Sequence, residues 1–277
     1  MPGAGARRDD RGKSSFDDIY DQPDPRAYFT RLRPLRYQIP HHAQPVFRRV
    51  LAERARLGPA REPVTVVDVC CSYGINAALL NHDLTLDDLY ARYTSPELAR
   101  LPAPELAAVD KRFYAARRRD DAVPVIGLDA SSAAVSYAAA AGLLDAGFAE
   151  NLEAAPASAG LARAVASAGL ITVTGGISYI GPRTFGTLLS LTRTPPHVAV
   201  FALRGVSYQP IAGILAARGL ITHTPARTYP QRRFTGPAER QRAIARVTAA
   251  GLDPAGRETA GYYHAALYLS RPAARGG

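Results

Sequence analysis

Two carboxylates lie at the ends of apolar, β-prone segments, where side chains can meet a ligand. Asp68 lies within the segment 65–69, which is followed by a tight turn at Gly74 and by residues that can begin a helix. Asp129 directly follows a second apolar segment, 123–128. A strand, a turn and a helix in this order present backbone N–H groups and a positive helix end to a ligand. A carboxylate after the second strand can accept both hydroxyl hydrogens of a ribose, so the two units predict a nucleoside site.

The turn after the first strand resembles motif I of the class I S-adenosylmethionine (SAM)-dependent methyltransferases, in which Asp or Glu precedes Gly-x-Gly-x-Gly. Here Cys70 and Ser72 replace the first two glycines, and Gly74 is the third. Both replacements are compact, but a Cβ atom disfavours positive φ. A dinucleotide pyrophosphate requires the full glycine set, whereas SAM has no phosphate, so the turn favours SAM over NAD or NADP. The resemblance implies SAM contacts from Asp68, Cys70, Ser72, Tyr73, Gly74 and Asn76.

Two later segments resemble the positions where the family holds the nucleoside. Asp129, with Ala130 after it, corresponds to the ribose-binding carboxylate, and capping of the next helix is its alternative role. Asn151 and Leu152 stand where the family's third strand reaches the adenine. An asparagine offers both the donor and the acceptor that an adenine edge requires. A surface turn before Pro156 is the alternative interpretation.

The segment after the strand 170–173 corresponds to the family's motif IV. Thr174 and Gly175 are placed to contact the methionine and sulfonium end of SAM, because glycine lets the backbone approach closely. Tyr179 follows and can face the reacting centre, since the π-face of a tyrosine can stabilise a sulfonium. A core tyrosine with a satisfied hydroxyl is the rival interpretation.

The segment 16–60 precedes the predicted sheet and is rich in Tyr, Asp, Gln and Arg. We expect one helix capped by Asp24 with Pro25 at its first position, and another from Gln44 to about Arg56. In small-molecule methyltransferases such an extension often roofs the substrate, which favours a lid over a helical brace. The candidate catalytic residues are Tyr20, Tyr28, Tyr179 and His41, with His42 and His264 as further candidate bases.

An insertion separates the two acidic markers. Asp68 and Asp129 are 61 positions apart, where a Rossmann-type unit has roughly 20. The segment 81–121 accounts for the difference and suggests two helices, the second over 104–119. It is either a cap over the site or a surface for packing or dimerisation, and a homodimer stays open.

The order of the segments predicts an α/β fold. We expect a Rossmann-like, doubly wound sheet of about seven strands, the class I methyltransferase fold, over residues 61–272. Two further strands are predicted at 197–203 and 262–270, and the resemblance implies that the last is antiparallel. Residues 1–15 are rich in Gly, Arg and Asp, and predict a disordered tail.

Composition limits the other classes of protein. The chain has 277 residues, 47% of them hydrophobic and 21% charged, as in a globular protein. Its charge of +10 comes from scattered arginines without an aromatic-interleaved basic stripe, which argues against nucleic acid as a partner. No apolar segment is long enough for a membrane span and no signal peptide is visible, so we expect a cytoplasmic protein. Cys70 and Cys71 are adjacent in the predicted turn, which argues against a disulfide or a metal site.

These features predict a SAM-dependent methyltransferase that acts on a small metabolite, most simply in specialised metabolism. The acceptor and the alkylated atom stay open. One alternative is an enzyme that cyclises SAM itself and releases methylthioadenosine, like the azetidine-2-carboxylate synthases. Another is a SAM-binding protein without catalytic activity.

Overall fold

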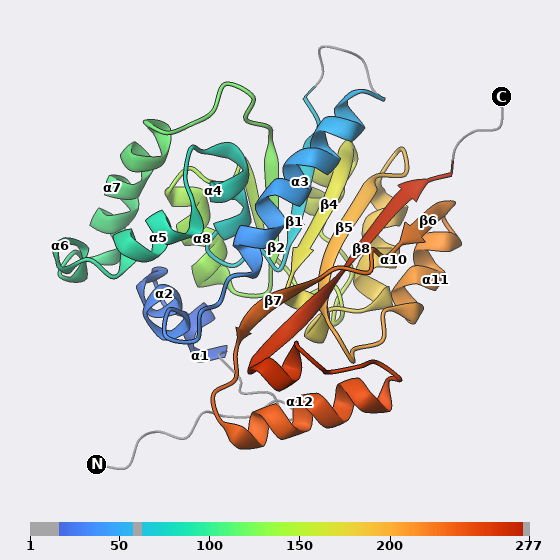
Figure 1. Cartoon of the computed structure of the whole chain (residues 1–277). Helices are drawn as coiled ribbons and strands as arrows, with labels where there is room; N and C mark the ends of the chain where they lie inside the picture. The colour runs from blue at the N-terminus through green and yellow to red at the C-terminus, as the bar shows by residue number, and fades with distance from the viewer. Residues whose placement is uncertain (1–16, 58–62, 274–277) are drawn as a thin grey trace.

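The computed structural model describes residues 17–57 and 63–273, so the expected tail at 1–15 lies outside the described residues. One sheet of eight strands forms the centre, in the order β3-β2-β1-β4-β5-β8-β6, with β7 also paired to β8 (Figure 1). The strands are β1 Thr65–Val69, β2 Val125–Asp129, β3 Ala146–Ala149, β4 Ala168–Thr174, β5 His197–Leu203, β6 Leu220–His223, β7 Thr228–Arg233 and β8 Tyr262–Pro272.

The first five strands are parallel, and β8 runs antiparallel between β5 and β6. This is the Rossmann-like fold of the class I methyltransferases, as the sequence predicted. The outer edge of β8 is shared, because its first half pairs with β7 and its second half with β6. The short β6 was not predicted, and with β7 it brings the sheet to eight strands.

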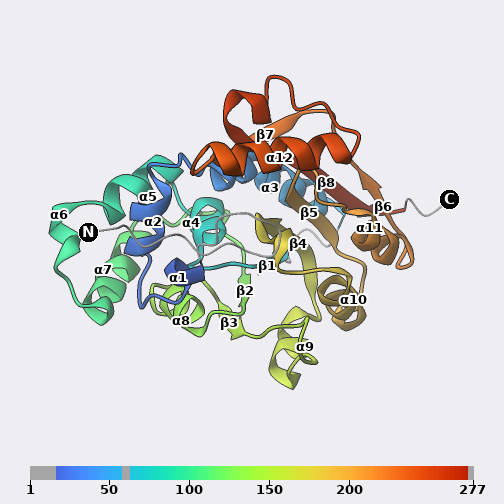
Figure 2. The ribbon, with the colours of Figure 1, turned by 90° about the horizontal axis from the view of Figure 1, so that it is seen from below.

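Helices cover both faces of the sheet, because alternate side chains of each strand enter different cores. Val66 belongs to the core under α3, α4 and α8, whereas Val67 belongs to the core under α9, α10 and α11. Figure 2 shows α3 and α9 on opposite sides of the strands. The helices are α1 Asp17–Tyr20, α2 Arg26–Leu32, α3 Ile39–Ala55, α4 Ile75–Asn81, α5 Leu86–Tyr93, α6 Pro96–Ala99, α7 Ala103–Ala115, α8 Ser132–Ala140, α9 Ala159–Val165, α10 Pro182–Leu191, α11 Gln209–Ala216 and α12 Pro237–Ala249.

Two helices near prolines begin at other residues than the sequence predicted. α3 begins at Ile39 rather than at Gln44, because Pro40 occupies its first turn, where no intrahelical donor is needed. His41 and His42 are therefore helical. α2 begins at Arg26 with Pro25 at the N-cap, and Asp24 accepts a hydrogen bond from the backbone N–H of Arg26 (3.0 Å) without being the cap itself.

Residues 17–57 and 63–273 contain no candidate for a membrane-spanning helix or for a group of metal-binding side chains. None of their helices combines the length and the apolar character that a membrane crossing requires. In the same ranges, no group of three or more His, Cys, Asp or Glu side chains is placed to hold a metal ion.

Candidate active site

A cavity of about 380 Å³ lies at the carboxyl ends of β1, β2 and β4. Parallel sheets bind ligands at this edge, and the volume lies within the range of small-molecule sites. It is lined by Tyr20, Asp21, Tyr28, Leu32, Tyr37, Pro40, Val69, Cys70, Cys71, Ser72, Ile75, Asn76, Leu128, Asp129, Ala130, Ser131, Glu150, Asn151, Leu152, Thr174, Gly175, Gly176, Tyr179, Ile180, Thr184, Gln231 and Arg232.

The turn after β1 has the positive φ angles that favour glycine, although two of the three residues with such angles are not glycines. Cys70 and Ser72 adopt φ values of 57° and 51°, and Gly74 adopts 78°. Positive φ is strained for residues with a Cβ atom and is common at functional sites. Cys70 also packs tightly on motif IV, since a Cβ added to Gly176 would lie 2.6 Å from the Cys70 sulfur. Burial raises the pKa of the Cys70 thiol, so it stays protonated near neutral pH.

Asp129 connects the ends of β1 and β2. Its Oδ2 accepts a hydrogen bond from the backbone N–H of Ser72 (2.9 Å), and its Oδ1 accepts one from Ser131 N–H (3.0 Å). The capping alternative does not hold, because the side chain of Ser131 caps α8. Each carboxylate oxygen keeps a second lone pair, so Asp129 can still accept from a diol. Burial raises the pKa of Asp129, and the two backbone bonds oppose that rise.

Asp68 lies behind the cavity rather than on it. Its Oδ1 accepts hydrogen bonds from Asn76 Nδ2 (3.0 Å) and Thr172 Oγ1 (2.8 Å), and the residue is 1% exposed. Burial raises the pKa of Asp68 to about 7. Asn76 Nδ2 also donates to Thr174 Oγ1 (3.0 Å), which joins β4 to this cluster. The cluster fixes the orientation of the Asn76 amide.

Three side-chain oxygens of lining residues are buried without a hydrogen-bond partner among the described residues. They are Ser72 Oγ, Asn76 Oδ1 and Gln231 Oε1. A buried acceptor without a partner costs free energy, so such groups mark positions where a ligand can donate hydrogen bonds. All three are suited to N–H or O–H groups.

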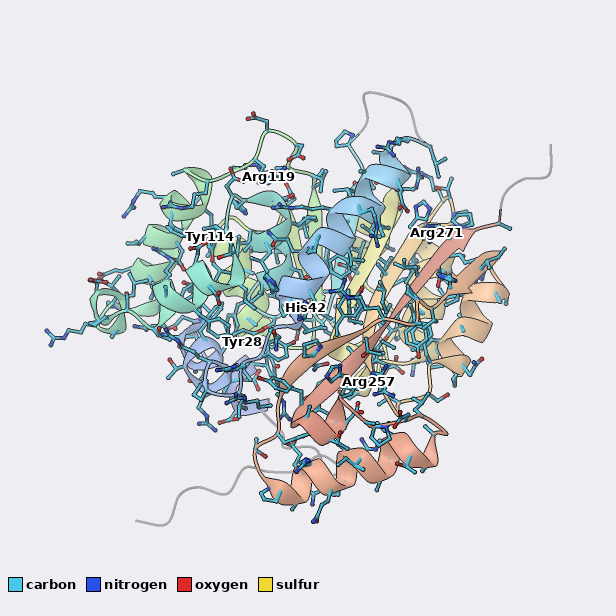
Figure 3. The ribbon with its side chains drawn as sticks, in the orientation of Figure 1. Tyr28, His42, Tyr114, Arg119, Arg257 and Arg271 are labelled. Carbon is cyan, nitrogen blue, oxygen red and sulfur yellow. The ribbon has the colours of Figure 1, made fainter. Side chains whose placement is uncertain are left out.

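Tyrosines from the N-terminal segment roof the cavity. The ring of Tyr28 makes edge contacts with those of Tyr20 (centroids 6.0 Å apart) and Tyr37 (6.1 Å), and Figure 3 shows Tyr28 on the α2 side of the sheet. Burial raises the pKa of all three, so their hydroxyls stay neutral at physiological pH. Tyr179 also lines the cavity and is 51% exposed, which places it at the mouth.

The N-terminal segment is both a roof and a brace. α1, α2 and the loop to α3 supply the tyrosines, and Ser131 Oγ ties the roof down by donating to Tyr20 O (2.6 Å). The hydroxyl hydrogen of Tyr73, next to the strained Ser72, is shared between Ile19 O (2.9 Å) and Gln22 O (2.8 Å). The longer α3 packs along β4, β5 and β7 instead.

The insertion at 81–121 supports the roof from outside. The ring of Phe29 on α2 stacks on that of Tyr93 (centroids 4.7 Å apart), and Tyr90 donates its hydroxyl to Tyr37 O (2.7 Å). Arg26 donates to Leu98 O (2.8 Å). None of the described residues in the insertion lines the cavity. It contains three helices, α5, α6 and α7, rather than two.

Twelve of the sixteen predicted site residues line the cavity, and four do not. Asn151 lines it from a turn in which its Oδ1 accepts from Glu153 N–H (3.0 Å), and Leu152 beside it is 2% exposed. The four outside the lining are Asp68 and Tyr73, described above, with Gly74 and His41.

Gly74 and His41 lie away from the cavity for different reasons. Gly74 packs against Leu143 and Ala138, so it shapes the turn from behind. His41 lines a second cavity on α3 together with His42, whose place on that helix Figure 3 shows. Burial lowers the pKa of His42 and of His264 to about 4. No histidine of the described residues lines the first cavity.

Sequence reasoning missed Tyr37, Gln231 and Arg232 as lining residues. Tyr37 follows α2, and the other two lie on β7, far away in sequence. Arg232 is 2% exposed and pairs with Glu239 (Nη2 to Oε1, 2.8 Å). The sequence of β7, Thr-Tyr-Pro-Gln-Arg-Arg, contains a proline and three polar residues in a row, so its β-propensity is weak. Local pattern therefore did not indicate that this segment is a strand of the sheet.

Solved structures of class I SAM-dependent methyltransferases are similar to this one at low sequence identity. No family model matches the sequence, and no curated protein matches it. Geranyl diphosphate methyltransferase in complex with SAM aligns at a TM-score of 0.44 and 10% identity, over 93% of this chain and 95% of that chain. Magnesium protoporphyrin IX methyltransferase from Synechocystis PCC 6803 with bound SAM aligns at 0.39 and 13%, over 97% and 100%. The [4+2]-cyclase SpnF aligns at 0.39 and 12%, over 82% and 81%. These similarities concern the fold alone.

Proposed function

We propose that this protein is a SAM-dependent methyltransferase for a small-molecule acceptor. The observation that carries the proposal is the pairing of Asp129 and Ser72 at the adjacent ends of β2 and β1, beside a cavity of about 380 Å³. A ribose diol would be held by Asp129, and an adenine by Asn151 and Leu152. The Asn76 amide oxygen and Ser72 Oγ would accept from the ammonium of the methionine end.

SAM, when bound, supplies an activated methyl group together with its own leaving group. The chain therefore has to align the acceptor and exclude water, and a dedicated base is not required. Burial keeps Tyr20, Tyr28 and Tyr37 protonated, so these three are not bases, and the described lining contains no histidine. The tyrosine roof would keep water from the acceptor, and Gly175, which has no Cβ, leaves room for Tyr37 and Gln231 at the end of β4.

The proposal is tested in two steps. SAM and S-adenosylhomocysteine should raise the thermal midpoint, and NAD and NADP should not, because a ligand that binds only the folded state stabilises it. With a panel of small acceptors, turnover should then release S-adenosylhomocysteine. Stabilisation by NAD instead of SAM would contradict the proposal. SAM binding without turnover of any acceptor would indicate a non-catalytic binder.

Cyclisation of SAM is the second candidate, and the roof is the observation that favours it. Tyr20, Tyr28 and Tyr37 close over the cavity with neutral hydroxyls, an arrangement that could fold the methionine tail back on itself. In that reaction the amine of SAM attacks its own γ-carbon, loses a proton and releases methylthioadenosine. Incubation with SAM alone separates the candidates, because cyclisation yields methylthioadenosine and methyl transfer yields nothing without an acceptor.

A further inference from the structure

A β-bulge in β7 brings two consecutive side chains to the cavity. Pro230 pairs with His264 and Arg232 with Tyr263, so the register shifts and Gln231 is the extra residue. Gln231 and Arg232 both line the cavity, and each is 2% exposed. In a regular strand, neighbouring side chains would point to opposite faces. Bulges re-aim side chains in this way beside active sites.

The outer edge of β7 holds the roof in place. Gln38 N–H donates to Gln231 O (2.8 Å), and Arg233 N–H donates to Leu35 O (2.6 Å). These two bonds attach the loop between α2 and α3, which contains Tyr37, to the bulged strand. Gln231 and Tyr37 are therefore positioned together.

Gln231 and Tyr37 both lie against the end of β4. A Cβ atom added to Gly175 would be 3.1 Å from Tyr37 Oη and 3.3 Å from Gln231 Nε2. β4 lies on the side of β1 opposite to β2, which provides Asp129. The cavity thus has two walls. The nucleoside wall contains Ser72 and Asp129, and the β7 wall contains Gly175, Tyr37 and Gln231.

The polar group of the β7 wall that lacks a partner is an uncharged hydrogen-bond acceptor. Gln231 Oε1 is buried and has no partner among the described residues. The neighbouring Arg232 charge is balanced by the buried Glu239 carboxylate, also 2% exposed. The rings of Tyr28 and Tyr37 add apolar surface. A neutral ligand group with one N–H or O–H donor fits this wall.

We propose that Gln231 determines acceptor specificity by accepting a hydrogen bond from an N–H or O–H group of the methyl acceptor. The acceptor is then a small, neutral molecule with such a donor, and its fully substituted analogue binds more weakly. This inference rests on the proposed function, because it takes the nucleoside wall as the SAM side.

The test uses phenol and its O-methyl analogue anisole as probes of the full-length protein saturated with S-adenosylhomocysteine. Ligand-observed NMR measures their affinities for the wild type, Gln231→Leu, Gln231→Glu and Gln241→Leu. The wild type should bind phenol about fivefold more tightly than anisole, the gain expected for one hydrogen bond. Gln231→Leu should lose this preference. Gln231→Glu should keep it, because a carboxylate also accepts. Gln241→Leu, at an exposed position of α12, is the matched control and should behave like the wild type.

Each other outcome overturns the inference. These outcomes are equal binding of the two probes by the wild type, binding of neither, a preference that survives in Gln231→Leu, or a preference that disappears in Gln231→Glu. Stabilisation by S-adenosylhomocysteine is measured first on every variant. If the wild type is not stabilised, the proposed function fails. If it is stabilised and shows no preference for phenol, only the role of Gln231 fails.

Discussion

The two walls of the cavity are built in different ways. The nucleoside wall consists of two neighbouring strand–turn–helix units, and its polar groups bond mainly to backbone within those units, as Asp129 does to Ser72 and Ser131. The β7 wall joins the loop after α2, the end of β4 and a bulged strand near the other end of the chain. Its Gln231 oxygen has no partner among the described residues. One wall is thus built from local units, and the other from segments that lie far apart in the sequence. Each has an oxygen without a partner among the described residues, Ser72 Oγ in the first and Gln231 Oε1 in the second.

The strongest expected effect comes from the contact between motif I and motif IV, where the walls meet. In Gly176→Ala the new Cβ would lie 2.6 Å from Cys70 Sγ and 2.8 Å from Cys70 Cβ, so the free energy of unfolding should fall by about 1–3 kcal/mol. Cys70→Gly removes both atoms and suits the φ of 57°. The double variant should therefore be more stable than Gly176→Ala alone in urea unfolding. Equal loss in the single and double variants would mean that the two motifs are not in contact there.

The stability of the protein should depend on pH through Asp68, which lies behind the nucleoside wall. The pKa of Asp68 rises from 3.8 in the unfolded chain to about 7 in the folded protein, because of burial. Between these values the folded protein keeps a proton that the unfolded chain has lost, so stability from this group falls as pH rises from about 4 to about 7. Above that range its contribution is constant.

In Asp68→Asn the side chain does not ionise, so this pH dependence is absent. Urea unfolding of both proteins should show the wild type losing stability relative to Asp68→Asn across that interval, and a constant difference above it. The histidines with lowered pKa, such as His42 and His264, act in both proteins and cancel in the comparison. A difference that does not change with pH would show that Asp68 ionises as an exposed carboxylate does.

A smaller effect is expected where the nucleoside turn holds the roof. Tyr73→Phe removes the hydroxyl that bonds Ile19 O and Gln22 O, which should cost about 1 kcal/mol locally. Hydrogen exchange in residues 19–32 should become faster while the sheet is unchanged. Tyr268→Phe removes a tyrosine hydroxyl on the other face of the sheet, where the ring stacks on that of Tyr208 (centroids 4.0 Å apart), and should leave that exchange as in the wild type. Unchanged exchange in Tyr73→Phe would show that other contacts, such as Ser131 to Tyr20, hold the roof alone.

The same contrast explains what the sequence could predict. β1 and β2 are apolar segments followed at once by their functional residues, so Asp129 and Ser72 could be found from local pattern and family resemblance. Gln231 and Tyr37 meet through a bulge and two backbone bonds between segments almost two hundred residues apart, and no local pattern specifies such a pairing. The insertion was ambiguous for the same reason, because its role as a support depends on Phe29 and Tyr93 meeting across the fold.

Titration of SAM by calorimetry into the wild type, Asp129→Ala and Gln231→Leu tests the central claim most directly. We predict that the wild type binds SAM and that Asp129→Ala binds it about tenfold or more weakly, the loss expected for hydrogen bonds to a charged group. Gln231→Leu should bind SAM with the affinity of the wild type, because it belongs to the other wall. An affinity that Asp129→Ala leaves unchanged would contradict the account.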